Sequence, residues 1–235
     1  MNGNYLIFQE RKNPLLNIKL PAKTAKITQS VMTIIKTSRL LYFIGIATTI
    51  LCCNPEQDLS LYEKKIITAR SFFDASFYGA NSVLEKSEIK NFNGLDFFKV
   101  DSSYRVKTQI KNLKKQKLIY LHTKTENVNK FQAKIKLSFS IKDTTYSLTA
   151  YQSSSSETNS YFIPFTDKTS GKSTYGGGRF LDLTMLNGSI IIDFNLAYNP
   201  TCVYNSKYNC PSPPKENHLP LNILVGEKTP LIENH

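Results

Sequence analysis

The sequence lacks an apolar run long enough to span a bilayer as a permanent helix. Its most apolar stretch, LLYFIGIATTIL, has 12 residues from Leu40 to Leu51, whereas a membrane helix needs about 20. The stretch follows a basic segment that begins at Met32, and a Cys-Cys pair comes directly after it. This order is typical of an export signal, so we expect residues 32–53 to be a signal peptide.

Cysteine is also scarce, with four residues in the chain, and two of them end the signal. A cysteine at this place resembles the lipobox of bacterial lipoproteins, in which that cysteine is lipidated and becomes the mature N-terminus. We therefore expect Cys53 to anchor an exported lipoprotein to the membrane of a bacterial cell envelope, with ordinary secretion as the alternative. Residues 1–31 look like an over-called translation start, and 54–59 like a polar tether.

Acidic residues are few, 18 against 30 basic ones, and the net charge of +12 raises the question of nucleic acid. Residues 1–53 hold seven of the basic side chains but one of the acidic ones, so the leader accounts for half of the net charge. The densest basic run beyond it, KNLKKQK at 111–117, is typical of a solvated turn between strands. We expect no nucleic-acid partner. The expected partners are the membrane, through the lipid anchor, and an unknown ligand of the envelope.

Internal repeats and helices between successive strands are absent from the pattern, which argues against a parallel α/β fold. Alternating apolar and polar residues predict half-buried antiparallel strands at 104–110 and 131–141, and Lys142-Asp143 predicts a tight turn after the second. Further strands are expected at 118–123, 145–152, 161–165, 180–186, 189–197 and 221–226. The polar segment 153–160 is expected to be a loop.

One helix is expected before these strands. Apolar residues recur at helical spacing over 60–75, and Ser60 precedes Glu63 by three residues, the pattern of a capping box. The predicted fold is mainly β, an antiparallel β-sandwich or barrel with one N-terminal amphipathic helix. It forms a single domain over 60–228, followed by a tail at 229–235.

The most unusual chemistry lies between Ile163 and Gly226. Gly171-Lys172-Ser173 ends like a phosphate-binding loop, but position 166 is threonine rather than glycine, and the glycines at 176–178 would break the required helix. These features exclude that motif.

The same glycine triplet leads into Arg179 and has two interpretations. It is either a turn or bulge that needs positive φ, or a place where a ligand approaches Tyr175 and Arg179 closely. The planar guanidinium of Arg179 suits an anionic or carboxylate group. The alternative is a structural ion pair with Asp167, Asp182 or Asp193.

Asp193 and Asn195 alternate with apolar neighbours, so they are expected on one face of a strand. That face is either plain solvent surface or part of a pocket. In a pocket, Asp193 is the first candidate for a general base, Glu216 the second and His218 the third. The residues expected to bind a ligand are Tyr175, Arg179, Asn195, Tyr198 and Asn217.

A long loop rich in Pro and Asn runs from Ala197 to Asn217. Cys202 and Cys210 remain as an even pair after export, so a disulfide between them is expected. Zinc binding with His218 and Cys-His catalysis are the alternatives, but the spacing matches no known zinc pattern and oxidation would silence a nucleophile. We expect no metal and no cofactor.

Three segments carry a family resemblance: GLDFFKVDSSYRVKTQI, then IPFTDKTSGKSTYGGGRFLDL, then IIIDFNLAYNPTCVYNSKYNCPSPPKENHLPLNILVGEK. Over about residues 60–228 the chain resembles the bacterial domain-of-unknown-function family numbered 1684. Ser212 and Val225 are small departures, where Leu or Ile and Ala are common. The resemblance implies a family without an established activity, many of whose members look like exported lipoproteins.

Three hypotheses follow for the function. The first is a lipid-anchored β domain that binds a small or polymeric ligand of the cell envelope. The second is an envelope hydrolase or lyase that uses Asp193 or Glu216 as base and Arg179 as anion anchor. The third is a structural envelope protein.

Overall fold

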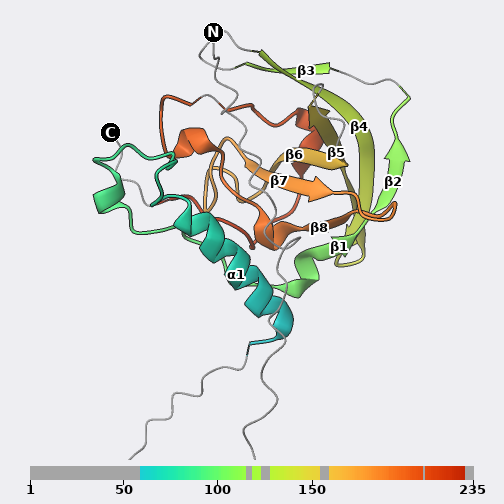
Figure 1. Cartoon of the computed structure of the whole chain (residues 1–235). Helices are drawn as coiled ribbons and strands as arrows, with labels where there is room; N and C mark the ends of the chain where they lie inside the picture. The colour runs from blue at the N-terminus through green and yellow to red at the C-terminus, as the bar shows by residue number, and fades with distance from the viewer. Residues whose placement is uncertain (1–58, 115–117, 123–127, 154–158, 209, 231–235) are drawn as a thin grey trace, which may run out of the picture.

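The computed structural model describes residues 59–230 apart from 115–117, 123–127, 154–158 and 209 (Figure 1). The expected signal peptide, the lipidation site Cys53 and nearly all of the tether therefore lie outside the described residues. So does most of the expected loop at 153–160.

The helix α1 (Leu61–Ala75) begins where the capping box predicts. The Ser60 side chain accepts a hydrogen bond from the Glu63 amide at 3.2 Å, and the Glu63 carboxylate accepts one from the Ser60 amide at 2.9 Å. Both bonds satisfy amides that the first helical turn leaves unpaired. The inward face of α1 buries Ile66, Ala69 and Phe73 together with one charged residue, Arg70.

A seven-stranded sheet forms most of the domain (Figure 1). Its main path runs β2–β4–β5–β6–β7, while β3 also pairs with β4 and β9 pairs with β6. The pairing is antiparallel throughout except between β6 and β9. The strands are β2 (Gln109–Asn112), β3 (Leu118–His122), β4 (Val128–Ile141), β5 (Thr144–Ser153), β6 (Ser160–Asp167), β7 (Arg179–Thr184) and β9 (His218–Leu219).

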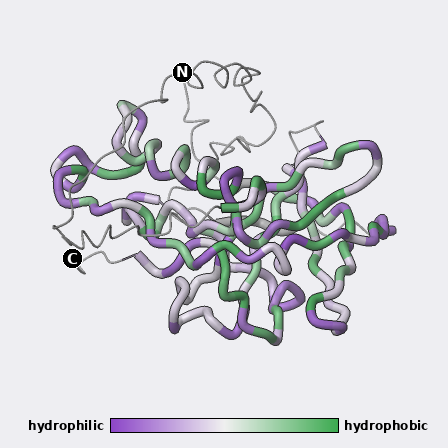
Figure 2. Tube along the Cα trace, turned by 90° about the horizontal axis from the view of Figure 1, so that it is seen from below, coloured by the Kyte–Doolittle hydropathy of each residue, from purple (hydrophilic) through white to green (hydrophobic). Residues whose placement is uncertain are grey.

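The longest hairpin joins β4 to β5 through the predicted turn. Lys142 and Asp143 both adopt positive φ, 48° and 62°. A two-residue hairpin turn whose twist matches that of the strands requires positive φ at both of these positions. Along β4, Ile135, Leu137 and Phe139 are buried, as the period-two pattern predicts. Figure 2 shows hydrophobic and hydrophilic residues alternating along such strands.

A second, two-stranded sheet pairs β1 (Arg105–Lys107) with β8 (Ile191–Asp193). Side chains from both sheets meet in one hydrophobic core, which includes Val106 and Ile192 from the small sheet and Leu137, Leu148 and Ile163 from the large one. The prediction of a mainly β, antiparallel, sandwich-like fold with one N-terminal helix is confirmed, and the described strands do not close into a barrel. Short 3₁₀ turns lie at Ile89–Asn91, Ser102–Tyr104, Phe194–Leu196, Thr201–Val203 and Lys215–Asn217.

Three predicted strands differ from the structure. The strand at 104–110 is divided into β1 and β2 at Thr108, so that each half joins a different sheet. The strand at 189–197 ends at Asp193, because a 3₁₀ turn follows at once. The segment 221–226 is not a strand, because the carbonyls of Ile223 and Val225 bond to a side chain instead of a neighbouring strand.

Candidate functional site

A polar cluster lies where α1 packs on the end of β8. The Tyr62 hydroxyl lies 3.0 and 2.9 Å from the two carboxylate oxygens of Asp193, to which it donates. The Asn195 side-chain amide lies 2.9 Å from the Tyr62 hydroxyl, 3.0 Å from Asp193 and 2.8 Å from the Asp101 carbonyl. These bonds connect the helix, the strand and the loop before β1.

The cluster is buried, which shifts the ionisation of its members. Burial raises the pKa of Asp193, although hydrogen bonds from Asn195 and Tyr62 and the nearby Arg105 guanidinium oppose the shift. Burial and the Asp193 carboxylate both raise the pKa of Tyr62, so that its hydroxyl stays protonated and remains a donor. Tyr62 is thus fixed as a neutral hydroxyl beside a carboxylate.

Arg70 bonds backbone carbonyls next to this cluster. Its guanidinium donates to the Asn195 carbonyl at 3.2 and 3.0 Å and to the Phe98 carbonyl at 2.8 Å. Burial lowers the pKa of Arg70 to about 10, so the group still carries its charge at neutral pH. A buried cation that bonds backbone carbonyls fixes the 3₁₀ turn after β8 against α1.

An open pocket of about 490 Å³ lies beside this cluster at the start of α1. Most of its lining groups are polar, and Tyr62 belongs both to the pocket and to the buried cluster. The lining residues are Ser60, Tyr62, Glu63, Lys99, Val100, Asp101, Ser102 and Leu224. Hydroxyl, carboxylate and ammonium groups in one open pocket can bind a polar ligand through several hydrogen bonds.

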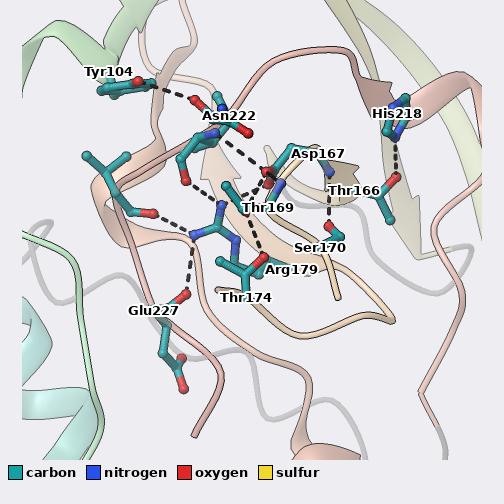
Figure 3. Close-up of polar contacts among 12 residues, drawn as sticks. Tyr104, Thr166, Asp167, Thr169, Ser170, Thr174, Arg179, His218, Asn222 and Glu227 are labelled. Atoms are coloured by element: carbon teal, nitrogen blue, oxygen red, sulfur yellow. Dashed lines mark hydrogen bonds and ion pairs between the residues drawn. The ribbon is translucent and has the colours of Figure 1, made fainter. Parts of the chain in front are cut away.

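Arg179 lies in a different buried network (Figure 3). Its Nη2 atom donates to the Asp167 carboxylate and to the Ile223 carbonyl, both at 2.9 Å, and its Nη1 atom bonds the carbonyls of Val225 and Glu227. Both side chains of the ion pair are 1% exposed. Asp167 is one of the three partners that the sequence offered for a structural ion pair.

Asp167 is held by further bonds at the end of β6. The amide of Thr169 donates to its carboxylate at 2.7 Å, and the Thr169 hydroxyl donates to the same oxygen at 2.5 Å. That hydroxyl lies 2.8 Å from the hydroxyl of Thr174 (Figure 3). The threonines of the TDKTSGKST segment therefore organise a turn around the carboxylate rather than a phosphate-binding loop.

Of the glycine triplet, Gly178 alone has positive φ, 88°. A Cβ atom there would lie 2.5 Å from the Phe165 carbonyl oxygen and 2.7 Å from Pro213. The Gly178 amide donates to the Tyr175 carbonyl at 3.0 Å, which closes a turn. At Gly178 the structure therefore supports the turn interpretation of the triplet.

Glu216 and Asn217 lie in the 3₁₀ turn Lys215–Asn217, and His218 begins β9, which pairs with β6. Exposed Glu216 lies 3.5 Å from the Tyr151 hydroxyl, and exposed His218 places Nδ1 3.0 Å from the Thr166 hydroxyl. In the described part of the chain, no hydrogen bond or ion pair joins Asp193 to Glu216, His218 or Arg179. The structure therefore does not bring the candidate bases into direct contact with one another.

Asn217 fills a gap between two strands. Backbone pairing between β5 and β6 is limited to Tyr151 with Phe162. The fully buried Asn217 side chain accepts a hydrogen bond from the Thr149 amide at 2.8 Å and donates to the carbonyls of Thr149 and Pro164 at 2.9 and 2.8 Å. The Asn217 side chain thus makes the hydrogen bonds that the backbone of a neighbouring strand would otherwise make.

The loop after β8 is closed by the predicted disulfide between Cys202 and Cys210, whose Cα atoms lie 5.8 Å apart. Near its start, the Tyr198 hydroxyl donates to Asp182 at 2.7 Å. Among the described residues, no group of three or more His, Cys, Asp or Glu side chains is arranged to hold a metal ion. No helix in this part of the chain is long and apolar enough to cross a membrane.

Sequence reasoning missed Tyr62, Arg70, Lys99 and Asp101. Tyr62 falls at an apolar position of the helical pattern over 60–75, although its hydroxyl needs a partner when buried. Arg70 carried a usable signal, because it falls on the same helical face as Ile66 and Phe73. A charged residue on an apolar face indicates a buried polar partner.

Comparison with known proteins agrees with this fold. An uncharacterized protein of Haloarcula marismortui, whose structure was solved by NMR in solution, is 31% identical, with a TM-score of 0.60. The similarity covers 73% of this chain and 96% of that one. A search of curated proteins finds no match.

The family comparison matches residues 90–228, more than half of the chain. The matched region contains the Asp167–Arg179 network, Asp193, Asn195 and the disulfide loop, while α1 precedes it. The chain belongs to the family DUF1684, which is described as a protein of unknown function.

Proposed function

We propose that the chain is an exported, lipid-anchored protein of the cell envelope that binds a polar ligand in the α1 pocket. The observation that carries the proposal is the position of Tyr62, which lines the pocket and whose hydroxyl is held in place by Asp193 and Asn195. A fixed tyrosine among charged and hydroxyl side chains favours a small or polymeric ligand rich in hydroxyl groups, such as an envelope sugar.

The hydrogen bonds that Asp193, the candidate base, already accepts favour binding over catalysis. The Asp193 carboxylate already accepts bonds from Tyr62 and from the Asn195 amides, and Arg105 lies 3.8 Å away. Glu216 has no contact with this cluster among the described residues. A general base needs a free acceptor within reach of a substrate proton.

The raised pKa of Asp193 favours the alternative function, an envelope hydrolase or lyase, because buried carboxylates with raised pKa values often serve as acids or bases. That function was predicted with Arg179 as the cation at the ligand. Arg179 is bonded to Asp167 and to carbonyls of its own chain, which supports a structural role for it instead.

The binding test uses the full chain and a thermal-shift screen against N-acetylglucosamine oligomers, muramic acid peptides and phosphorylated polyols. We expect one probe class to raise Tm, and the variants Lys99→Ala and Ser102→Ala to lose most of that shift. Lys142→Ala, at the β4–β5 turn, is the matched control and should keep it. A Tm shift that survives both pocket substitutions would place the ligand elsewhere.

The anchor is tested separately by growing cells with an alkyne-bearing fatty acid. We expect the wild-type chain to incorporate the acyl label and Cys53→Ala to lose it. Equal labelling of both chains, or none in either, would contradict lipidation at Cys53. Hydrolysis of a probe by the wild-type chain but not by Asp193→Asn would establish the enzyme alternative.

A further inference from the structure

A second pocket, of about 420 Å³, lies between the segment 78–89, which follows α1, and the loop that the disulfide closes. We call it the loop pocket. Its volume falls within the range of about 300–1,000 Å³ that is usual for small-molecule sites. No residue lines both this pocket and the α1 pocket, so the two are separate sites.

Three polar contacts hold the two walls of the loop pocket together. The Lys207 ammonium lies 2.7 Å from the Glu85 carboxylate. The Asn205 side-chain amide donates to the Val83 carbonyl at 2.7 Å and to the Glu85 carboxylate at 3.3 Å. The walls are therefore in place before a ligand binds, which reduces the cost of ordering them on binding.

Two polar side chains in the loop pocket are available to a ligand. Tyr208 is partly buried, yet its hydroxyl makes no hydrogen bond with any other described residue. The exposed Lys86 forms neither a hydrogen bond nor an ion pair within the described ranges. The other two charged residues of the lining, Glu85 and Lys207, pair with each other, so Lys86 leaves the pocket with a net charge of +1.

The loop pocket also presents an aromatic ring. Tyr78 is 47% exposed, and its ring lies against that of Phe92, with the centroids 5.5 Å apart. The Tyr78 hydroxyl donates to the Phe92 carbonyl at 3.2 Å. A tyrosine ring that is fixed in this way offers an apolar surface on which the flat C–H face of a sugar ring can pack.

We propose that the loop pocket binds an acidic sugar, with the sugar ring on Tyr78, the acid group at Lys86 and a hydroxyl group at Tyr208. A neutral sugar would leave the Lys86 charge without a partner. A small inorganic anion would make no use of the tyrosine rings. This site lies outside the α1 pocket and does not depend on the function proposed for it.

The disulfide controls one wall of the loop pocket. Asn205, Lys207 and Tyr208 all lie between Cys202 and Cys210, so the bridge limits the conformations of the loop that carries them. We therefore expect reduction of the disulfide to weaken binding of the sugar. Unchanged affinity after reduction would overturn this dependence.

The test is isothermal titration calorimetry of the full, oxidised chain with trigalacturonic acid and with its methyl ester, which has the same rings without the charge. We expect the acid to bind about fivefold more tightly than the ester, as for one exposed ion pair, and Lys86→Gln to remove that preference. Tyr208→Ala should weaken binding of both probes. Lys90→Gln is the matched control, because Lys90 is exposed but does not line the pocket.

Other outcomes would overturn the proposal. Equal affinity for the acid and the ester would exclude recognition of the acid group, and equally tight binding of inorganic phosphate would show that the sugar ring is not recognised. Binding that is lost in Lys99→Ala and kept in Lys86→Gln would place the probe in the α1 pocket. Absence of binding by either sugar probe would overturn the loop pocket alone, because the α1 pocket is tested by its own variants.

Discussion

Arg179 and Asp167 form an ion pair, with Nη2 and the carboxylate oxygen 2.9 Å apart and both side chains almost wholly buried. The pair joins the start of β7 to the end of β6, and Nη1 and Nη2 also donate to carbonyls of the segment 223–227, while the buried Nε has no hydrogen-bond partner among the described residues. One side chain therefore holds three stretches of chain together. A substitution that removes one partner leaves the charge of the other buried and unpaired.

We expect Arg179→Met to lower the free energy of unfolding by about 3–5 kcal/mol, since Asp167 would remain buried without its cation. Urea denaturation monitored by circular dichroism measures the loss. The control is Lys207→Met, which breaks the exposed pair with Glu85 and should change stability little. Equal effects of the two substitutions would show that the buried pair contributes no more than a surface pair.

The turn before Arg179 depends on one glycine. Gly178→Ala would force a side chain into positive φ and against the Phe165 carbonyl, so we expect a loss of about 1–3 kcal/mol or more. Gly176→Ala is the matched control, because its Cβ would meet no atom closer than 3.6 Å. Thermal unfolding of the two variants distinguishes the positions, and a tolerated Gly178→Ala would contradict the turn described here.

We expect the Asn217 side chain to contribute more to the free energy of unfolding than an ordinary side-chain contact does. Asn217→Ala removes the side-chain partner of the Thr149 amide and of the carbonyls of Thr149 and Pro164, of which the last bond is buried, and this should cost about 3 kcal/mol. The partly exposed Asn205 offers a comparison, since water can replace its bond to Val83. Hydrogen exchange at Thr149 is the most direct measurement, and it should accelerate in Asn217→Ala only.

Asp193 predicts a pH dependence of stability with a defined sign. Its pKa in the folded state lies above the ordinary value of 3.8, chiefly because of burial, so folding favours the protonated form. The stability that this proton contributes is present below 3.8 and is lost as pH rises through the folded pKa. The stability of the wild type relative to Asp193→Asn should therefore fall from acid toward neutral pH. A relative stability that rises over this range in urea titrations would contradict the burial effect.

Local signals sufficed for much of the fold. The capping box at Ser60 gave the start of α1 within a residue, and the period-two pattern with Lys142-Asp143 gave the β4–β5 hairpin. Such features depend on neighbours in sequence, which propensity and spacing describe well. The segment 221–226 has the composition of a strand, but a single distant side chain, Arg179, takes up its carbonyls.

The candidate site was predictable only in part. Asp193 and Asn195 were expected on one face, and the structure places them together, but α1 covers that face and Tyr62 completes the cluster. Nothing in the spacing around Asp193 indicates that a tyrosine 131 residues earlier will donate to it. For Arg179 the sequence offered either an anion site or an ion pair with Asp167, Asp182 or Asp193, and the structure shows Asp167 and the carbonyls of 223–227 as its partners. Contacts between distant segments decide such questions, and periodicity carries no information about them.

The bonds from Arg179 to the carbonyls of Ile223, Val225 and Glu227 also bear on how the protein is made. β6 and β7 precede these residues in the chain, so the guanidinium and Asp167 lack part of their hydrogen-bond partners until the segment 223–227 has been synthesised. This segment lies beyond β9, the last of the described strands. A chain that contains every described strand therefore still cannot complete the bonds around its buried ion pair without residues 223–227.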